Sequence, residues 1–302
     1  RSSGTYTQLN TRVLGNLKTI RDYAAANEEW GTYLAATVLR AFTYQVLVDC
    51  YEQVPYTEAM NTAYPSPKYD DGLTVYQGVI AEIDEALAKA SESDLVCSNF
   101  LFPSAGAQEW VRFANALKLK MYMRISGVAD VQSAVDALVA EGNFPTSDVA
   151  WMGCWTDEGG KANPYFSEEF GSYTSVQKNV SLNLALQGTM SSYNDARLAA
   201  FFDPSSNGNY TGAISGTNFS VSASDHGAGY WCRPAVRFNS PVYLITVSEV
   251  EFFLAEYYAK KDPSKAEAHY KAAVDASFAS AGVTGADAVY GSGAAYAWDA
   301  SA

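Results

Sequence analysis

Two stripes of apolar residues recur at intervals of three or four along the first fifty residues. The first stripe comprises Leu9, Val13, Leu17 and Ile20. The second follows the polar segment NEEWG and comprises Leu34, Val38, Phe42 and Gln45 to Val46. Because residues at this spacing share one face of an α-helix, both stripes predict helices. Pro55 ends the second helical region, since proline has no N–H to donate and its ring obstructs the preceding turn.

Three further helices are predicted before residue 142. Thr74 and Gln77 have the spacing of a capping box, which predicts that a helix starts at Thr74. Its apolar stripe is Tyr76, Val79, Ile80, Ile83, Leu87 and Ala90. After a loop to about Gln108, the segment EWVRFANALKLKMYMRIS predicts a second helix with Trp110 on its core-facing stripe. A short third helix is predicted over 131–141.

The pattern changes between Gly142 and about Asn239, where Gly, Ser, Asn and aromatic residues dominate. Helical periodicity is patchy there, and SSYNDARLAAFF is one short helical island. A segment of this length is too long for an ordinary loop in a compact domain. We therefore expect short elements within it, and long irregular segments often carry function.

Regular helical spacing returns at Thr246, which forms a second capping-box pattern with Glu249. Asp262 followed by proline predicts the start of a further helix, and Gly282 predicts its end. The inner faces comprise Val250, Phe253, Leu254 and Tyr257, then Ala266, Tyr270, Ala273 or Val274, and Phe278. Two such helices form an antiparallel hairpin of the tetratricopeptide type, although no clean repeat of about 34 residues is visible. The fold class predicted is therefore mostly α: helical pairs with a long irregular insertion.

Composition narrows the classes of function. The chain has 302 residues, of which 48% are hydrophobic, as in an ordinary globular protein. Its 20 Lys and Arg against 33 Asp and Glu give a net charge of −13. A field of that sign repels the phosphates of nucleic acids, so nucleic acid is discounted as a partner. No run of about 18 apolar residues is present, which argues against a membrane-spanning helix.

Cysteine and histidine offer little for a metal centre or a catalytic triad, and no cofactor is predicted. The cysteines are far apart and form no CxxC motif: Cys50, Cys97, Cys154 and Cys232. The two histidines are His226 and His269. Asp70 and Asp71, with nearby loop carbonyls, offer oxygen ligands for Ca²⁺, but their spacing is not that of an EF-hand loop.

Five motifs in order resemble one family. They are RAFTYQVLVDCYEQVPYTEA, PKYDDGLTVYQGVIAEIDEALAKA, EWVRFANALKLKMYMRIS, NDARLAAFF and PVYLITVSEVEFFLAEYYAK. Together they resemble the SusD/RagB family, in particular its SusD-like branch, over roughly residues 10 to 285. The resemblance implies a surface-exposed lipoprotein of the outer membrane in certain Gram-negative bacteria. It also implies binding of an oligosaccharide, or in some branches a peptide, and delivery to a SusC-like TonB-dependent receptor. Members are binding proteins and not enzymes, built on four tetratricopeptide-like helix pairs.

The resemblance predicts a single SusD-like domain over 1–302, with 1–141 and 246–285 as helical scaffold and 142–245 as the irregular ligand-binding insertion. The N-terminal cysteine that carries the family's lipid anchor is absent from this chain, which is expected to lack segments at one or both ends. NDARL stands where NDPRL is common in the family. In the family, segments like YEQVPYTEA end a scaffold helix and begin a surface loop. Tyr51 and Tyr56 are therefore expected to pack under that loop.

A sugar site needs an aromatic face for the C–H side of the ring and planar polar groups for the hydroxyls. The insertion carries both types of side chain. The predicted ligand-binding residues are Trp231, Tyr230, Arg233, Arg237, Trp151, Trp155, Tyr210 and Asn209, with Asn207 beside the last. Trp231 is the strongest single candidate because a tyrosine and an arginine flank it. The alternative is that these tryptophans anchor their loops to the core.

Two other classes of function stay open. A glycosidase needs two carboxylates at a defined separation, and the insertion holds the doublets Asp157–Glu158 and Glu168–Glu169. Adjacent acids usually point apart, and so many acidic residues make chance doublets common. A helical-repeat scaffold that binds only protein or peptide, without affinity for glycans, is the other class.

Overall fold

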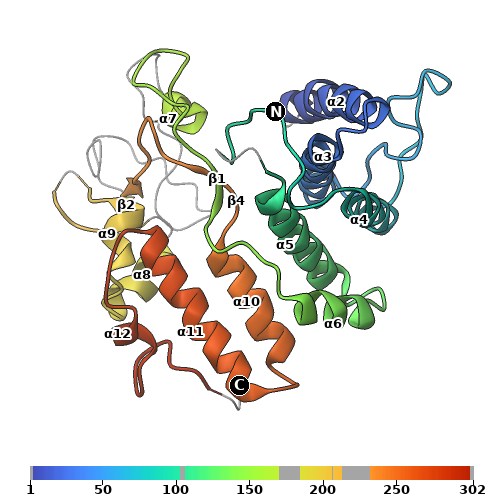
Figure 1. The fold of residues 1–302 in the computed structure, drawn as a ribbon. Helices are drawn as coiled ribbons and strands as arrows, with labels where there is room; N and C mark the ends of the chain where they lie inside the picture. The colour runs from blue at the N-terminus through green and yellow to red at the C-terminus, as the bar shows by residue number, and fades with distance from the viewer. Residues whose placement is uncertain (1–2, 103–105, 170–183, 206, 213–231, 300–302) are drawn as a thin grey trace. The chain divides into compact units, whose positions relative to one another are not determined.

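The computed structural model describes residues 3–102, 106–169, 184–205, 207–212 and 232–299. The chain packs as two units, Arg1–Val149 and Ala150–Ala302, which are described in turn. The first unit is helical (Figure 1). Its elements are α1 (Ser3–Thr7), a π-helical turn (Gln8–Val13), α2 (Leu14–Ala26), α3 (Trp30–Tyr51), α4 (Gly72–Lys89), α5 (Gln108–Ile125) and α6 (Gln132–Glu141).

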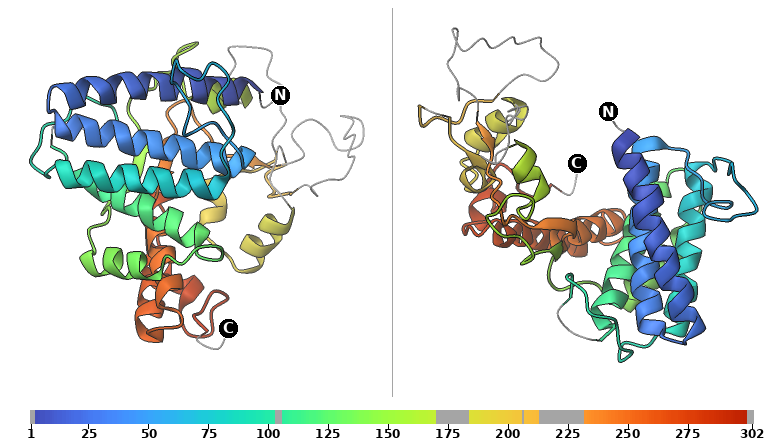
Figure 2. Two further views of the ribbon diagram at one scale, coloured as in Figure 1. Left: turned by 90° about the vertical axis from the view of Figure 1, so that its right-hand side faces the viewer. Right: turned by 90° about the horizontal axis from the view of Figure 1, so that it is seen from above.

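Helix α3 is central to this unit and packs against α2, α4 and α5. Figure 2 shows α2, α3 and α4 lying side by side. Val13 and Ile20 of the first predicted stripe are exposed, so the prediction of a buried face is wrong at these two positions. Leu17, Leu34, Val38 and Ile83 of the predicted inner faces are buried, and Trp110 is 1% exposed, as predicted. Burial of such large apolar side chains stabilises the unit by roughly 1.5–3 kcal/mol for each one.

Glu82 of α4 joins three segments of the first unit. Its carboxylate accepts hydrogen bonds from Arg21 of α2 at 3.0 Å and from Arg40 of α3 at 2.9 Å. The hydroxyl of Tyr56 donates to the same group at 2.8 Å. The ring of Tyr56 also packs edge-on against Tyr44, with centroids 5.1 Å apart. Tyr56 therefore packs in the helical layer, where it ties the segment after α3 to α4.

The start of α4 differs from the prediction. The N-cap is Asp71, whose carboxylate accepts from the backbone N–H of Thr74 at 3.0 Å. Thr74 lies in the first turn, and its hydroxyl donates to Asp71 at 2.6 Å. The predicted capping box at Thr74 and Gln77 is therefore wrong. Both Asp and Thr are good N-caps, and here the residue three positions earlier takes that role.

The neighbouring Asp70 closes the loop between α3 and α4. It is 7% exposed, and it accepts hydrogen bonds from the backbone N–H groups of Tyr56 at 3.1 Å and Thr57 at 2.8 Å. Val54 and Asp70 also form an isolated antiparallel bridge. The carboxylates of Asp70 and Asp71 thus serve the backbone, and no cluster of three or more metal-ligating side chains occurs among the described residues. Tyr51, which ends α3, packs edge-on against Tyr6 with centroids 5.0 Å apart.

The second unit carries the irregular insertion and the closing helical hairpin. Its elements are β1 (Val149–Trp151), α7 (Pro164–Glu169), α8 (Leu184–Ser192), α9 (Arg197–Phe201), β2 (Phe202–Asp203), β3 (Arg233–Pro234), β4 (Val242–Ile245), α10 (Val247–Tyr258), α11 (Pro263–Ser280) and α12 (Asp287–Tyr290). β1 pairs with β4, and β2 pairs antiparallel with β3. The expectation of short elements within the insertion is confirmed, and the mostly α fold class with it.

Helices α10 and α11 form the predicted hairpin (Figure 1). Thr246 is the N-cap of α10 and accepts from the N–H of Glu249 at 3.0 Å. Asp262 is the N-cap of α11, with proline at its first position. Gly282 follows α11 with φ +68°, a conformation that suits glycine. Each of these three boundaries confirms the sequence prediction.

The island SSYNDARLAAFF is not one helix. Asn194 has φ +52°, which ends the helical path between α8 and α9. The side chain of Asp195 then binds the backbone N–H of Arg197 at 3.0 Å.

The single-domain prediction over 1–302 stays a prediction. None of the helices in the described parts of the chain is long and apolar enough to cross a bilayer.

Candidate functional site

The structure brings Trp151 and Trp155 together. Trp151 ends β1, and Trp155 begins a turn in which the N–H of Thr156 donates to the carbonyl of Lys161 at 3.0 Å. The two indole rings are stacked, with centroids 6.2 Å apart and an angle of 22° between their planes. Trp151 is 40% exposed and Trp155 is half-buried. The half-buried ring of Trp155 thus packs against the exposed ring of Trp151 and fixes its orientation.

Asn163 follows the turn after the tryptophans and ties it to the segment 238–240, and the sequence analysis missed this residue. It is 4% exposed. Its backbone N–H donates to the carbonyl of Phe238 at 2.7 Å, and its side-chain amide donates to the carbonyl of Ser240 at 2.8 Å. Its Oδ1 accepts from the backbone N–H groups of Tyr165 and Phe166 at the start of α7. Asn followed by proline is a helix-start pattern that could have identified it.

Arg233 lies on β3, and Arg237 lies in the turn that follows this strand. Arg233 stands opposite Asp203 in the β2–β3 pair. Arg237 makes a two-pronged ion pair with the same Asp203, with N–O distances of 2.6 and 2.8 Å. These hydrogen bonds raise the pKa of Arg237 above its already high value. A guanidinium has five N–H donors, so the pair orients Arg237 without using its whole donor set.

Asn209 and Tyr210 are held beside a buried cysteine. The thiol of Cys232 donates to the carbonyl of Asn209 at 3.2 Å and accepts from the N–H of Thr211 at 2.9 Å. The hydroxyl of Ser205 donates to the same carbonyl of Asn209 at 2.7 Å. The backbone of Asn209 is thus fixed while its side chain is exposed, and Tyr210 is half-buried.

Tyr230 and Trp231, the strongest candidates from the sequence, lie outside the described residues, as does His226. Their roles stay predictions. Among the residues that are described, two groups form: the stacked tryptophans, and the set of Arg233 and Arg237 on β3 and the turn after it. Asn163 bonds to the carbonyls of Phe238 and Ser240, in the turn that follows Arg237.

The acidic doublets do not form a pair of facing carboxylates in the described part of the insertion. Glu158 forms an ion pair with Lys161 at 2.6 Å on an exposed turn. Asp157 and Glu168 are exposed. The side chain of Glu169 lies outside the described residues.

A groove of about 490 Å³ lies in the second unit, between the end of α9, β3, β4 and the C-terminal end of α11. Residues 234–236, which separate Arg233 from Arg237, form part of its wall. Phe201 and Tyr243 contribute the aromatic rings, and serine and threonine contribute the polar groups. None of the six predicted site residues that the structure describes lines this groove.

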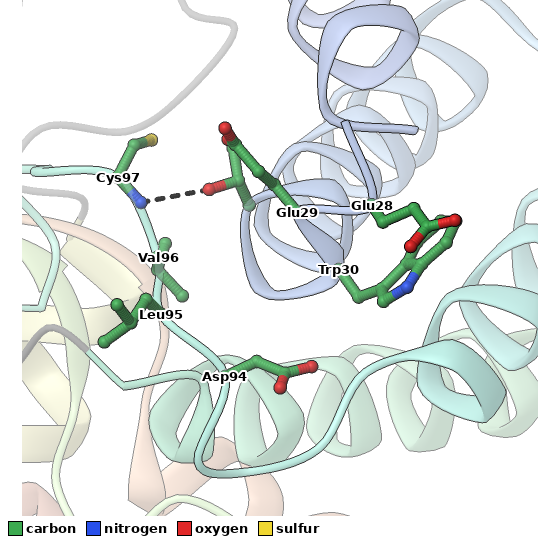
Figure 3. A pocket seen from close by; sticks show the side chains of 8 residues that line it. Glu28, Glu29, Trp30, Asp94, Leu95, Val96 and Cys97 are labelled. Carbon is green, nitrogen blue, oxygen red and sulfur yellow. Dashed lines mark hydrogen bonds between the residues drawn. The ribbon is translucent and has the colours of Figure 1, made fainter. Parts of the chain in front are cut away.

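A second cavity of about 500 Å³ lies in the first unit (Figure 3). Three carboxylates line it, those of Glu28, Glu29 and Asp94, together with Trp30. The ammonium of Lys89 lies 5.1 Å from the centre of the Trp30 ring. A neutral ligand there would have to displace water from three charged groups, which is costly. The groove of the second unit is the better candidate for such a ligand.

Comparison with known proteins points in one direction. The SusD-like family, described as "Starch-binding associating with outer membrane", matches residues 2–296. A SusD homologue from Bacteroides uniformis is 25% identical, with a TM-score of 0.78 over 92% of this chain and 59% of that one. A chitin-binding SusD homologue from Flavobacterium johnsoniae is 23% identical, with a TM-score of 0.76 over 94% and 60%.

A SusD-like protein from Bacteroides thetaiotaomicron is 24% identical, with a TM-score of 0.74 over 95% of this chain and 61% of that one. The chain thus spans about three fifths of the length of these three structures. None of the curated proteins matches it.

Proposed function

Because the chain belongs to the SusD-like family, whose model matches nearly its whole length, we propose that it is part of a nutrient-binding protein of the outer membrane. Its ligand is a neutral oligosaccharide, captured at the cell surface. Binding occurs without chemical conversion of the sugar. The bound sugar then passes to a SusC-like TonB-dependent receptor, while a lipid anchor holds the protein at the membrane.

The stacked pair of Trp151 and Trp155 is the observation that carries the proposal. A hexose ring presents C–H groups on one side, and these pack well against an indole face. A binding surface gains most from an aromatic ring that is already ordered, because less conformational entropy is lost on binding. Trp155 supplies that order by stacking on Trp151 at 6.2 Å.

The charge of the chain supports a neutral ligand. At −13 the field disfavours anionic polysaccharides and phosphorylated sugars. The family description names starch and the description of one structural relative names chitin, and both are polymers of uncharged hexose units. A neutral glucan or an N-acetylated glycan is therefore the class to test first.

Isothermal titration with a panel of malto- and chito-oligosaccharides tests the proposal. We expect at least one series to bind, and Trp151→Ala to weaken its affinity by about tenfold, or about 1.4 kcal/mol. Tyr23→Ala is the matched control, because Tyr23 is an exposed aromatic residue of α2 in the first unit, 61% exposed. No binding across the panel would refute glycan capture, and equal binding by wild type and Trp151→Ala would remove Trp151 from the site.

The transport step needs a separate measurement. Affinity purification of the anchored protein from its native membrane should recover a TonB-dependent receptor. The second candidate function is a scaffold that binds peptide or protein. The α10–α11 hairpin supports it, because tetratricopeptide-like helix pairs present surfaces that bind such partners. That scaffold would recover the receptor while failing to bind any sugar of the panel. Release of reducing ends from the panel sugars would instead indicate a hydrolase.

A further inference from the structure

We infer that the groove between Phe201 and Tyr243 is a second sugar subsite, which takes a neutral hexose ring through two aromatic faces and a ring of hydroxyl groups. This inference rests on the proposed function and extends it to a site that none of the described residues among the predicted ones lines. All described lining residues of the groove belong to the second unit.

The two aromatic rings of the groove are exposed, as is Ser280, while the other described lining residues are half-buried. Phe201 ends α9 and is 41% exposed, and Tyr243 of β4 is 45% exposed. The backbone holds Phe201 in place, since its carbonyl accepts from the N–H of Ala235 at 2.8 Å. The hydroxyl of Ser280 donates to that of Tyr243 at 3.3 Å, which orients the second ring. Two oriented and exposed rings on one groove match the C–H faces of a sugar.

Hydroxyl groups supply the polar part of the groove, and each makes one bond to the protein. Ser277 accepts from Arg197 at 2.9 Å, and Thr246 accepts from the N–H of Glu249 at 3.0 Å. Ser248 donates to the carbonyl of Ala273 at 2.8 Å. A hydroxyl has one donor and two acceptor positions, so each of these groups keeps capacity for a ligand while its position is fixed.

The lining residues that the structure describes include no charged side chain. Arg197, which bonds Ser277 of the wall, is paired with Asp195 at 2.6 Å. An ionic ligand would therefore find no partner and would lose its hydration. A purely apolar ligand would leave several hydroxyls without water or a partner. A neutral polyhydroxylated ring satisfies both parts of the lining, and about 490 Å³ lies within the range of small-molecule sites.

The groove and the tryptophan pair share a support. Ser240 lines the groove, and its carbonyl accepts from the side chain of Asn163, which follows the turn after Trp155 in the chain. β4, which carries Tyr243, pairs with β1, which ends at Trp151. Trp151 and Tyr243 thus lie on the two paired strands of one small sheet.

The test uses the best-binding oligosaccharide of the panel and isothermal titration. We expect Phe201→Ala and Tyr243→Ala each to weaken affinity by about three- to tenfold, because each removes one stacking face. Tyr243→Phe keeps the ring and should stay within about twofold of wild type. Phe252→Ala is the matched control: Phe252 is 42% exposed on α10 and does not line the groove. It should bind as wild type does.

A groove-filling variant guards against loss of folding in the truncations. Ala200→Trp adds an indole to the wall without removing any contact, and it should weaken binding as Tyr243→Ala does. Wild-type affinity in Ala200→Trp, Phe201→Ala and Tyr243→Ala, together with a weakened Trp151→Ala, would overturn the subsite and leave the proposed function standing. Absence of any sugar binding by the wild type would overturn both.

Discussion

The guanidinium of Arg197 donates a hydrogen bond to the hydroxyl of Ser277 at 2.9 Å, joining the start of α9 to the last turn of α11. The same group holds both oxygens of Asp195, at 3.0 and 2.6 Å. It also lies 4.6 Å from the centre of the Phe278 ring, a residue of the hydrophobic core. One side chain thus connects the wall of the groove to the interior of the second unit.

Arg197→Ala should destabilise the protein strongly. The side chain of Asp195 is 1% exposed, so the substitution leaves a buried carboxylate without its cation. Breaking such a pair costs about 3–5 kcal/mol. Arg197→Lys keeps the charge but loses the planar fork, and should fall between wild type and alanine. Urea unfolding measures the difference, with Lys18→Ala as control, because its ion pair with Asp22 is exposed. Equal stability of Arg197→Ala and Lys18→Ala would contradict the prediction.

Acid should weaken the protein through the same carboxylate. Burial acts to raise the pKa of Asp195, but the hydrogen bonds from Arg197 outweigh it and hold the pKa below the usual 3.8. Burial likewise opposes the hydrogen bonds of Thr57, which lower the pKa of Asp70. A lowered carboxyl pKa stabilises the fold above the unfolded value, and this stabilisation is lost as pH falls through the folded value.

We therefore expect the free energy of unfolding to fall as the pH drops below about 3.8, the ordinary aspartate value. Urea unfolding at a series of pH values measures the slope. Arg197→Ala removes the cause at Asp195, so its stability should fall less steeply over that range. Parallel slopes for the two proteins would show that Asp195 does not contribute to the acid sensitivity.

Gly15 of α2 and Gly78 of α4 are both helical but differ in their surroundings, so they give a matched pair of substitutions. A Cβ added to Gly78 would lie 2.5 Å from the hydroxyl oxygen of Tyr56, whereas one added to Gly15 would meet nothing within 4 Å. Gly78→Ala should thus push Tyr56 off Glu82 and destabilise the fold by about 1–3 kcal/mol. Gly15→Ala should stabilise it by about 0.5–1 kcal/mol, since alanine favours the helix. Thermal unfolding of both variants distinguishes the signs, and stabilisation by Gly78→Ala would contradict the packing of Tyr56.

The scaffold was predictable from sequence because its helices bury one continuous face. The apolar spacing that placed Trp110 in the core reports burial directly. Caps were less certain. Asp71 and Thr74 are both good capping residues three positions apart, and periodicity does not choose between them. The predicted cap at Thr246 is confirmed, since its hydroxyl accepts from the N–H of Glu249.

The site was predictable only in part, because its geometry depends on contacts between distant segments. Trp151 and Trp155 are close in the chain, so their pairing follows from one short turn. The groove instead joins the end of α9, β3, β4 and the end of α11. No local pattern relates Phe201 to Tyr243, and the residues between them include segments outside the described chain. Such a juxtaposition becomes visible only in three dimensions.

Arg237 and Asp203 allow the predicted ligand role of Arg237 to be separated from its structural role. Their side chains are 55% and 43% exposed, so the ion pair should contribute at most about 1 kcal/mol to stability. Arg237→Ala and Asp203→Ala should therefore unfold at similar urea concentrations. If Arg237 donates to a sugar hydroxyl, Arg237→Ala should weaken oligosaccharide affinity by about three- to tenfold, equivalent to one hydrogen bond. Asp203→Ala keeps that donor and should stay within about threefold of wild type, because only its orientation is lost. Equal losses in the two variants would assign Arg237 to holding β2 and β3 together, and an unchanged affinity in both would remove it from the site.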